Sequence, residues 1–287
     1  MTYLLKFIII RKTYLLKNLI YRELELLIID VNGVSITRDK KHLLRDVNWS
    51  VSSGEHWAIL GLNGSGKTTL LHMLNGYIYP STGNVSVLGK TFGKTDLREL
   101  RKSIGWVSTA IQEKLYMSES AEEIVLSGRF ASIGLYDEPK MEDLERATYL
   151  LEQFDCVHLA KRPYSSLSQG EKQRILIARG LMPSPSILIL DEPCTGLDIL
   201  AKEQLLSIVE KLSGEKNGPT LIYVTHHTEE ILDVFSHTLL LKSGQVHSSG
   251  KTEAILTEEV LSEFLEIPIH LEWQQNRAWI RLKNGSR

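Results

Sequence analysis

The sequence predicts an α/β protein with a mostly parallel central sheet, an antiparallel β part before it and a helical insert within it. Short and almost wholly apolar runs, "ILILD" at 187–191 and "LIYVT" at 221–225, are typical of parallel strands buried on both faces. Residues 27–36 and 43–51 alternate apolar and polar side chains, as half-buried antiparallel strands do. Residues 117–161 show instead the 3.6-residue period of amphipathic helices.

The composition is that of an ordinary globular protein. The chain has 287 residues, of which 43% are hydrophobic and 24% charged, with a formal net charge of -2. This balance gives no indication of a nucleic acid partner or of a broadly basic, membrane-binding face. Cys156 and Cys194 belong to no CxxC or Cys/His pattern. We therefore expect two reduced thiols and neither a disulfide framework nor a zinc site.

The first 23 residues form an apolar and basic segment of uncertain role. Lys6, Arg11, Lys12 and Lys17 interrupt the apolar run too often for a membrane span of about 20 residues. A signal peptide would need a longer apolar run and a small-residue cleavage site, and neither is visible. We interpret the segment as a peripheral extension or a start-site artefact, with a basic amphipathic membrane contact as the alternative.

The remaining elements follow in order. Residues 56–60 are predicted to form a strand, 61–66 a glycine-rich loop and 68–74 a helix. A short β unit at 81–89 and a strand at 103–109 precede the helical insert, which spans about 113–168. After the two buried strands, residues 237–250 suggest a hairpin that turns at Ser243 and Gly244. The last part, 251–287, is expected to be a helix and a hairpin-like tail, either regulatory or only packing.

The glycine-rich loop matches the pattern G-x-x-x-x-G-K-[ST]. Glycines let backbone amides turn inward without Cβ clashes, and these amides, with the start of the following helix, hold phosphate oxygens. Lys67 is expected to reach the β- and γ-phosphates, and the Thr68 hydroxyl to bind Mg²⁺. A glycine turn that merely caps a helix is the alternative. The predicted nucleotide-binding residues are Gly61, Leu62, Asn63, Gly64, Ser65, Gly66, Lys67, Thr68 and Thr69.

Two adjacent carboxylates end the apolar run at 187–191. Asp191 is the expected second contact to Mg²⁺, usually through water. Glu192 falls just beyond the strand, where a carboxylate can accept a proton from an attacking water. Acidic residues after a strand are often only the start of a solvated loop, but together with Lys67 they indicate a nucleotidase. The predicted fold class is therefore an α/β P-loop NTPase core.

Residues 164–181, "YSSLSQGEKQRILIARGL", look like a second phosphate site, because small polar residues precede an amphipathic helix. The order of the loop at 61–69, "LSQGEKQR", "ILILDEP", "GLD" at 196–198 and "VTH" at 224–226 resembles the nucleotide-binding domain of ATP-binding cassette (ABC) proteins. The resemblance covers about 24–250. It implies that the helical insert is the signature subdomain of that family and that the cofactors are ATP and Mg²⁺.

The resemblance also assigns the second phosphate site to a partner. It implies that Ser168 and Gly170 face the γ-phosphate held at Lys67 of a second copy, in a head-to-tail dimer. Ser168 could also cap the helix that follows it, and capping alone is the alternative. By the same resemblance, His226 touches the γ-phosphate and the attacking water, and Asp198 couples the two sites across the dimer.

Two positions depart from the family pattern. The residue expected to stack on adenine is Arg38 in place of an aromatic ring, and a guanidinium plane can also stack on a base. The family glutamine that contacts Mg²⁺ is replaced by Thr109, with Gln112 three residues later. We expect Gln112 to contact Mg²⁺ through a longer loop, with Thr109 as the alternative.

The resemblance implies an ATPase that dimerises around two ATP molecules and powers separate membrane permease subunits from the cytoplasmic face. The insert and tail look similar to those of importers of metal chelates or of oxyanions such as molybdate. The alternative is a soluble single-cassette ABC ATPase in cytosolic assembly or regulation. A small-molecule kinase with a P-loop would need no "LSQGE" and is disfavoured, and no nucleic acid partner is expected.

Overall fold

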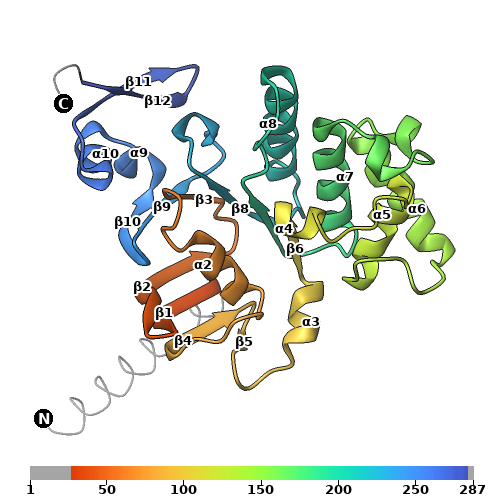
Figure 1. Cartoon of the computed structure of the whole chain (residues 1–287), viewed down its shortest axis with the longest axis horizontal. Helices are drawn as coiled ribbons and strands as arrows, with labels where there is room; N and C mark the ends of the chain where they lie inside the picture. Colours follow the sequence, from red (N-terminus) through yellow and green to blue (C-terminus); the bar gives the residue numbers. More distant parts are fainter. Residues whose placement is uncertain (1–26, 284–287) are drawn as a thin grey trace, which may run out of the picture.

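A six-stranded sheet runs through the centre of the structure, a computed structural model that describes residues 27–283 (Figure 1). The predicted N-terminal extension, 1–23, lies outside the described residues. All strands of the sheet run parallel except β10 at one edge, which pairs antiparallel with β9. The mostly parallel sheet expected from the sequence is therefore confirmed. In spatial order the strands are β10 (Gln245–Lys251), β9 (His237–Lys242), β3 (Trp57–Leu60), β8 (Thr220–Thr225), β7 (Ile187–Asp191) and β6 (Ile104–Ser108).

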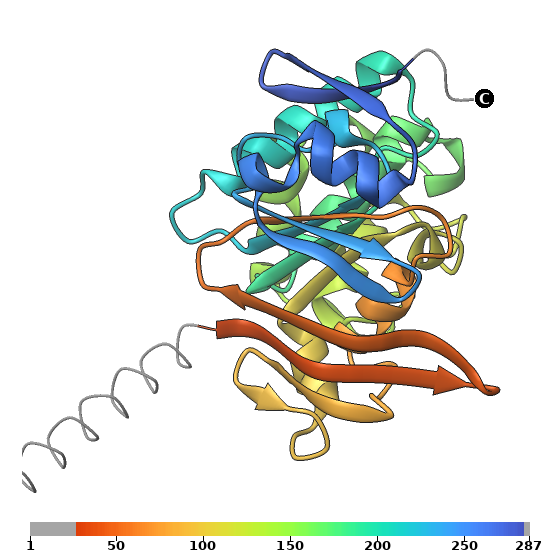
Figure 2. The same cartoon turned by 90° about the vertical axis from the view of Figure 1, so that its left-hand side faces the viewer.

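A second, antiparallel sheet is formed by the first strands of the chain and lies beside the central sheet (Figure 2). Its long strands β1 and β2 pair through a turn at Asp39 and Lys40, whose φ angles of 50° and 63° suit a two-residue hairpin. In spatial order its strands are β2 (Lys41–Ser52), β1 (Leu27–Arg38), β4 (Thr82–Val87) and β5 (Lys90–Thr91).

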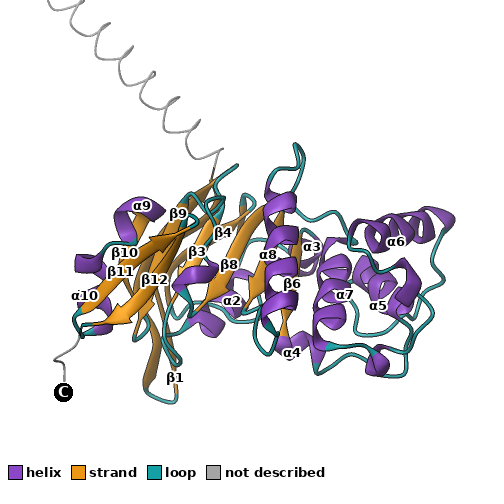
Figure 3. Cartoon of the chain, turned by 90° about the horizontal axis from the view of Figure 1, so that it is seen from above, coloured by secondary structure: helices purple, strands orange, loops and turns teal. Residues whose placement is uncertain are grey.

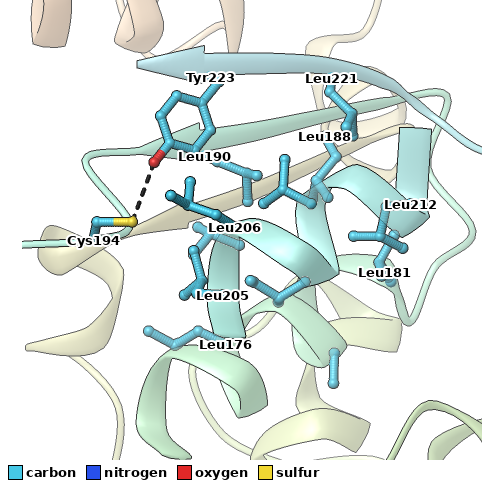
Figure 4. Packing of buried hydrophobic residues seen from close by; sticks show 14 of the residues in the cluster. Leu176, Leu181, Leu188, Leu190, Cys194, Leu205, Leu206, Leu212, Leu221 and Tyr223 are labelled. Atoms are coloured by element: carbon cyan, nitrogen blue, oxygen red, sulfur yellow. Dashed lines mark hydrogen bonds between the residues drawn. The ribbon is translucent and has the colours of Figure 1, made fainter. Parts of the chain in front are cut away.

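Two apolar cores fill the space on the two faces of the central sheet. On one face, α2 (Lys67–Leu74) and α3 (Leu97–Lys102) pack with the antiparallel sheet. On the other, α7 (Gln169–Leu181) and α8 (Ile199–Ser213) pack with the helical insert, and Figure 4 shows part of this core. The strands of the central sheet supply side chains to both cores, which explains their almost wholly apolar sequences.

The helical insert lies beyond β6, at the end of the molecule seen on the right of Figure 3. The helix α7 packs so closely against β6 and against the start of η1 that both contacts require a glycine. A Cβ atom at Gly105 of β6 would lie 2.4 Å from the Gly180 carbonyl oxygen, and one at Gly128 would lie 2.1 Å from that of Arg179. The insert consists of α4 (Thr109–Gln112), α5 (Ala121–Ser127), η1 (Gly128–Phe130), α6 (Met141–Gln153), η2 (Val157–Leu159) and η3 (Tyr164–Ser166).

The C-terminal part returns to the sheet. The expected hairpin at Ser243 and Gly244 joins β9 to β10, and a second hairpin turns at 275–276. An ion pair of 2.7 Å between Arg277 and Glu203 ties this second hairpin to α8. Among residues 27–283, no helix has the length and apolarity that a membrane span requires. The remaining elements are η4 (Thr228–Glu230), α9 (Thr252–Ile255), α10 (Glu258–Leu265), β11 (Ile269–Gln274) and β12 (Arg277–Leu282).

Candidate functional site

The glycine-rich loop connects β3 to α2, so that Lys67 is the first residue of the helix. Gly64 and Gly66 have φ angles of 76° and 105°, which non-glycine residues rarely adopt. The Lys67 ammonium is buried and donates hydrogen bonds to the carbonyl oxygens of Gly61 (2.7 Å) and Leu62 (3.3 Å). The first N–H groups of α2 have no side-chain cap. They are therefore available to an anion.

This loop forms one wall of a hollow of about 770 Å³. We call it the nucleotide hollow, after the nucleotide that the loop pattern predicts. The other walls come from the ends of β7 and β6, from β2 and from the turn between β9 and β10. Residues that the sequence predicts and that line the hollow are Asn63, Gly64, Ser65, Gly66, Lys67, Thr68, Thr69, Thr109, Asp191 and Glu192. Residues that sequence reasoning missed are His42, Leu43, Ala110, Ser243 and Gly244.

The two adjacent carboxylates, Asp191 and Glu192, line this hollow. Asp191 ends β7, and Glu192 follows with a φ angle of 49° while its N–H donates to the Val224 carbonyl at 2.9 Å. Burial, with a contribution from the Glu192 charge, raises the pKa of Asp191 to about 6, although Lys67 acts in the opposite direction. Two neighbouring carboxylates with one ammonium leave an excess of negative charge that a cation can neutralise.

Glu192 connects the predicted catalytic residues. Its Oε1 atom lies 3.3 Å from Lys67 Nζ and 3.6 Å from His226 Nδ1. These groups come from the start of α2, the end of β7 and the end of β8. Parallel strands bring their carboxyl ends to one edge of a sheet, and this edge is where an α/β sheet places its reactive groups.

The donor set fits Mg²⁺ held together with a nucleotide. Asp191 and the Thr68 hydroxyl line the same hollow, and the buried Ser65 Oγ has no hydrogen-bond partner among the described residues. Residues 27–283 contain no cluster of three or more His, Cys, Asp or Glu side chains that would hold a metal by itself. This matches Mg²⁺, which proteins typically bind through one or two carboxylates and the substrate phosphates.

Gln112 does not line this hollow, whereas its alternative Thr109 does. The longer loop is instead the single-turn helix α4, which Ser108 caps by accepting a hydrogen bond from the Ile111 N–H. Thr109, at the start of this turn, lines the nucleotide hollow. Gln112, at the end of this turn, is buried and points to α7, which we call the signature helix. Its Nε2 atom lies 3.5 Å from the Oε1 atom of Gln169, the first residue of that helix. One helical turn separates the two side chains, and the geometry favours Thr109 as the residue next to the nucleotide.

Arg38 is the second departure. It ends β1 at the hairpin tip, its side chain is 79% exposed, and it lies 3.9 Å from Asp39. It is not among the residues that line the hollow, whereas His42, across the same turn, is one of them. Arg38 is therefore not positioned in the hollow to stack on a base that binds there.

Ser168 and Gly170 lie in a different hollow, of about 140 Å³. Ser168 caps α7, because its Oγ accepts from the Glu171 N–H at 3.3 Å while Glu171 Oε2 accepts from the Ser168 N–H at 2.7 Å. The same hollow contains Asp198, which caps α8 in turn. Capping is thus present, and the predicted site residues fall into two groups on one chain.

The turn between β9 and β10 is the part of the site that sequence reasoning missed. The Gly244 N–H donates to the Ser65 carbonyl, and the Gly244 carbonyl accepts from the Arg45 N–H, each at 2.8 Å. The sequence signals a turn at this position. Its contact with a loop almost 180 residues earlier depends on the pairing of β9 with β3, which no local pattern specifies.

Comparison with known proteins shows the family of the chain. A family model described as ABC transporter matches residues 44–195. The chain is 51% identical over 255 residues to the "Uncharacterized ABC transporter ATP-binding protein YlmA" of Bacillus subtilis, covering 88% of this chain and 97% of that one. It is 31% identical to the manganese transport system ATP-binding protein MntB of Bacillus subtilis (82% and 91% covered) and 33% identical to the molybdate import ATP-binding protein MolC of Haemophilus influenzae (79% and 83%).

Solved structures show the same fold. The chain is similar to cbiO1 from Clostridium perfringens, part of the ABC transporter complex cbiONQ, with a TM-score of 0.71, 27% identity and coverage of 84% and 94%. It is also similar to the dimeric structure of the cassette MJ0796, with a TM-score of 0.68, 28% identity and coverage of 78% and 98%.

Proposed function

Because the chain belongs to the ABC transporter family, as an ATP-binding subunit and ATPase, we propose that two copies close head to tail around two ATP molecules and power separate permease subunits. In each site, Lys67 and its loop hold the phosphates of one ATP, and Ser168 and Gly170 of the other copy complete the site.

The observation that carries this proposal is the separation of the two groups of site residues. No residue of the described chain lines both the hollow around Lys67 and the hollow around Ser168. Each contains the start of a helix, α2 in the first and α7 in the second, and the N–H groups at a helix start can bind phosphate oxygens. Next to Asp198, the side chains of Ile199 and Leu200 are 84% and 69% exposed. Exposed apolar groups beside a half-site are consistent with burial against a second copy.

The residues divide the chemistry of hydrolysis among them. Glu192 accepts a proton from the attacking water, and His226, 3.6 Å from it, orients that water and the γ-phosphate. Lys67 and the amides of α2 stabilise the charge that develops on the phosphate oxygens. Asp191 and Thr68 would hold Mg²⁺, which would neutralise charge on the β- and γ-phosphates.

The permease is proposed to dock in a hollow of about 380 Å³ between the part of the chain that carries α2 and α3 and the helical insert with α7. Aromatic and basic side chains line it, among them Tyr77, Trp106 and Arg101, whose guanidinium lies 4.5 Å from the Tyr77 ring centre. The helix α4 contributes Ala110 to this hollow and to the nucleotide hollow. A single turn of helix thus connects the two, so a change at the nucleotide can be transmitted to a docked segment.

The proposed cargo is a metal chelate or an oxyanion. The relative named for molybdate import supports an oxyanion, and the one named for manganese transport supports a metal-containing cargo. Each is more than 30% identical over most of the chain. The permease partner places the chain on the cytoplasmic face of the membrane, as a peripheral subunit. A cassette in cytosolic assembly is the alternative, and recovery from detergent-solubilised membranes with permease subunits would distinguish the two.

A complementation experiment tests the composite site. Lys67→Ala and Ser168→Asp are each expected to abolish ATP hydrolysis. In a mixed dimer, the intact Lys67 of one copy meets the intact Ser168 of the other, so that one of the two sites is complete. Mixing the two inactive proteins is expected to restore part of the activity, measured as phosphate release. If the mixture stays inactive while a mixed dimer is detected by crosslinking, the head-to-tail site is wrong.

A further inference from the structure

Behind the catalytic residues lies a buried carboxylate that the reaction does not explain. Glu230, at the end of η4, is 3% exposed. Its Oε2 atom accepts hydrogen bonds from the Thr225 hydroxyl at 2.7 Å and the Tyr223 hydroxyl at 3.1 Å. Its Oε1 atom lies 3.0 Å from Lys202 Nζ. A buried carboxylate is costly unless it is fully paired, and here two hydroxyl donors and an ammonium satisfy it.

The hydrogen bonds of Glu230 hold the segment that carries His226. Thr225 directly precedes His226, and its hydroxyl oxygen also accepts a hydrogen bond from the His227 N–H at 3.0 Å. The hydroxyl proton points to Glu230, so its oxygen faces the following turn. The backbone is thereby tied on both sides of His226, at Thr225 and at His227.

Three segments of the active site converge on this carboxylate. Lys202 comes from α8, four residues after Asp198, and Tyr223 comes from β8. The third is the segment after Glu192, because Cys194 Sγ lies 3.3 Å from the Tyr223 hydroxyl oxygen (Figure 4). A hollow of about 250 Å³ is lined by Glu192 and His226 as well as by Glu230 and Lys202. The carboxylate thus contacts β8 and α8 directly, and it reaches the segment after Glu192 through Tyr223 and Cys194.

We propose that Glu230, with Lys202 as its counter-ion, is a positioning residue that fixes His226 against Glu192 and links this geometry to α8. This inference rests on the proposed role of His226 in hydrolysis. Glu230 contacts neither nucleotide nor water in this scheme. It acts through Thr225, and its loss is expected to slow the chemical step without weakening the binding of ATP.

Glu230→Gln tests the proposal. A glutamine that turns its NH₂ group to the Lys202 ammonium makes a repulsive donor–donor contact. In the other orientation both hydroxyls must rotate and accept from the NH₂ group, which changes the hydrogen bonding of Thr225 beside His226. We expect kcat for ATP hydrolysis to fall by roughly tenfold to a hundredfold, as a misplaced catalytic group causes, with KM for ATP unchanged. The double variant Lys202→Met/Glu230→Gln removes the repulsion but also the link to α8 and the ion pair of Lys202 with Glu229, and it is expected to recover part of kcat.

Control variants separate positioning from folding. Glu203→Gln, next to Lys202 on α8, breaks only the ion pair with Arg277 and is expected to leave kcat unchanged. Thr225→Ser keeps the hydroxyl and is expected to retain kcat, whereas Thr225→Val, of the same shape, is expected to match Glu230→Gln. Should Glu230→Gln fail to fold, as judged by its thermal unfolding, this second pair of variants carries the test.

The outcomes divide the two proposals. His226→Ala with an unchanged kcat would overturn the role of His226 and this inference with it. A strong effect of His226→Ala combined with wild-type kcat in both Glu230→Gln and Thr225→Val would overturn this inference alone. A raised KM with unchanged kcat in folded Glu230→Gln, or a double variant no faster than Glu230→Gln, would also overturn it.

Discussion

The Nζ atom of Lys67 lies 3.3 Å from the Oε1 atom of Glu192, so the group proposed to hold phosphate and the group proposed to activate water are paired with each other. A γ-phosphate at the loop would compete for the same ammonium. When it takes the place of the carboxylate, Glu192 loses its ion pair with Lys67. In the proposed mechanism, binding of the nucleotide therefore releases Glu192 from Lys67.

Replacing Lys67 removes one charge-assisted contact to the phosphates. For Lys67→Ala we expect ATP to bind roughly 10 to 100 times more weakly, the range that hydrogen bonds to charged groups give. Isothermal titration calorimetry with ATP and Mg²⁺ measures the change. Lys102→Ala is the matched control, because its ammonium contacts Glu99 on the surface. Equal affinity of Lys67→Ala and wild type would contradict the assignment.

Stability should depend on pH through Asp191. Its pKa is raised to about 6 in the folded chain, mainly by burial, so ionisation of the carboxyl is harder there than in the unfolded chain. The carboxylate therefore lowers the free energy of unfolding increasingly as the pH rises from about 4 through 6. Without Mg²⁺ or nucleotide, we expect Asp191→Asn to be roughly 2 to 3 kcal/mol more stable than wild type at pH 7.5.

Urea unfolding in the presence of a chelator measures this difference. It should become small near pH 4, where the unfolded carboxyl is about half protonated, and approach zero near pH 3, where the carboxyl is protonated in both states. Saturating Mg²⁺ and ATP should reverse the order at pH 7.5, because a bound cation stabilises the ionised form. A difference that does not change with pH would show that Asp191 is not the responsible group.

The positions of Thr109 and Gln112 predict different defects. Thr109 lines the nucleotide hollow, so Thr109→Val is expected to raise KM for Mg²⁺ and ATP about fivefold, the value of one lost hydrogen bond. Gln112 contacts Gln169 of the signature helix, so Gln112→Ala is expected to leave KM unchanged. Steady-state ATPase assays over a range of Mg²⁺ concentrations distinguish them. The reverse pattern would restore Gln112 as the metal contact.

Two substitutions of Ser168 separate its cap from its proposed contact with phosphate. Ser168→Ala removes the cap and should lower the free energy of unfolding by about 1 kcal/mol. Ser168→Asp keeps a good cap but places a negative charge opposite the partner's γ-phosphate. Stability should then be preserved, while the ATP-dependent dimer of a Glu192→Gln background should be lost. Gel filtration with ATP measures the dimer, and a dimer that persists in Ser168→Asp would leave Ser168 with capping alone.

The sequence predicts the local parts of the site and misses those that depend on tertiary contacts. Lys67, Asp191 and Glu192 belong to strand, loop and helix segments whose pattern fixes their geometry, and the structure brings them together. Gln112 is different, because the cap at Ser108 starts a helical turn where a loop was expected. His42 and the turn at Gly244 reach the nucleotide hollow only through the pairing of strands distant in sequence.

The alternation of β7 has a consequence for mutational studies. Ile189 packs into the core that contains α2, while Leu190 packs into the core that contains α7 and α8. In the proposed dimer, neighbouring residues thus support opposite halves of the ATP site, the half that holds a chain's own nucleotide and the half offered to the partner. Truncation of either side chain to alanine creates a cavity on one face only. We therefore expect destabilising alleles at these two adjacent codons to impair different halves of the proposed composite site.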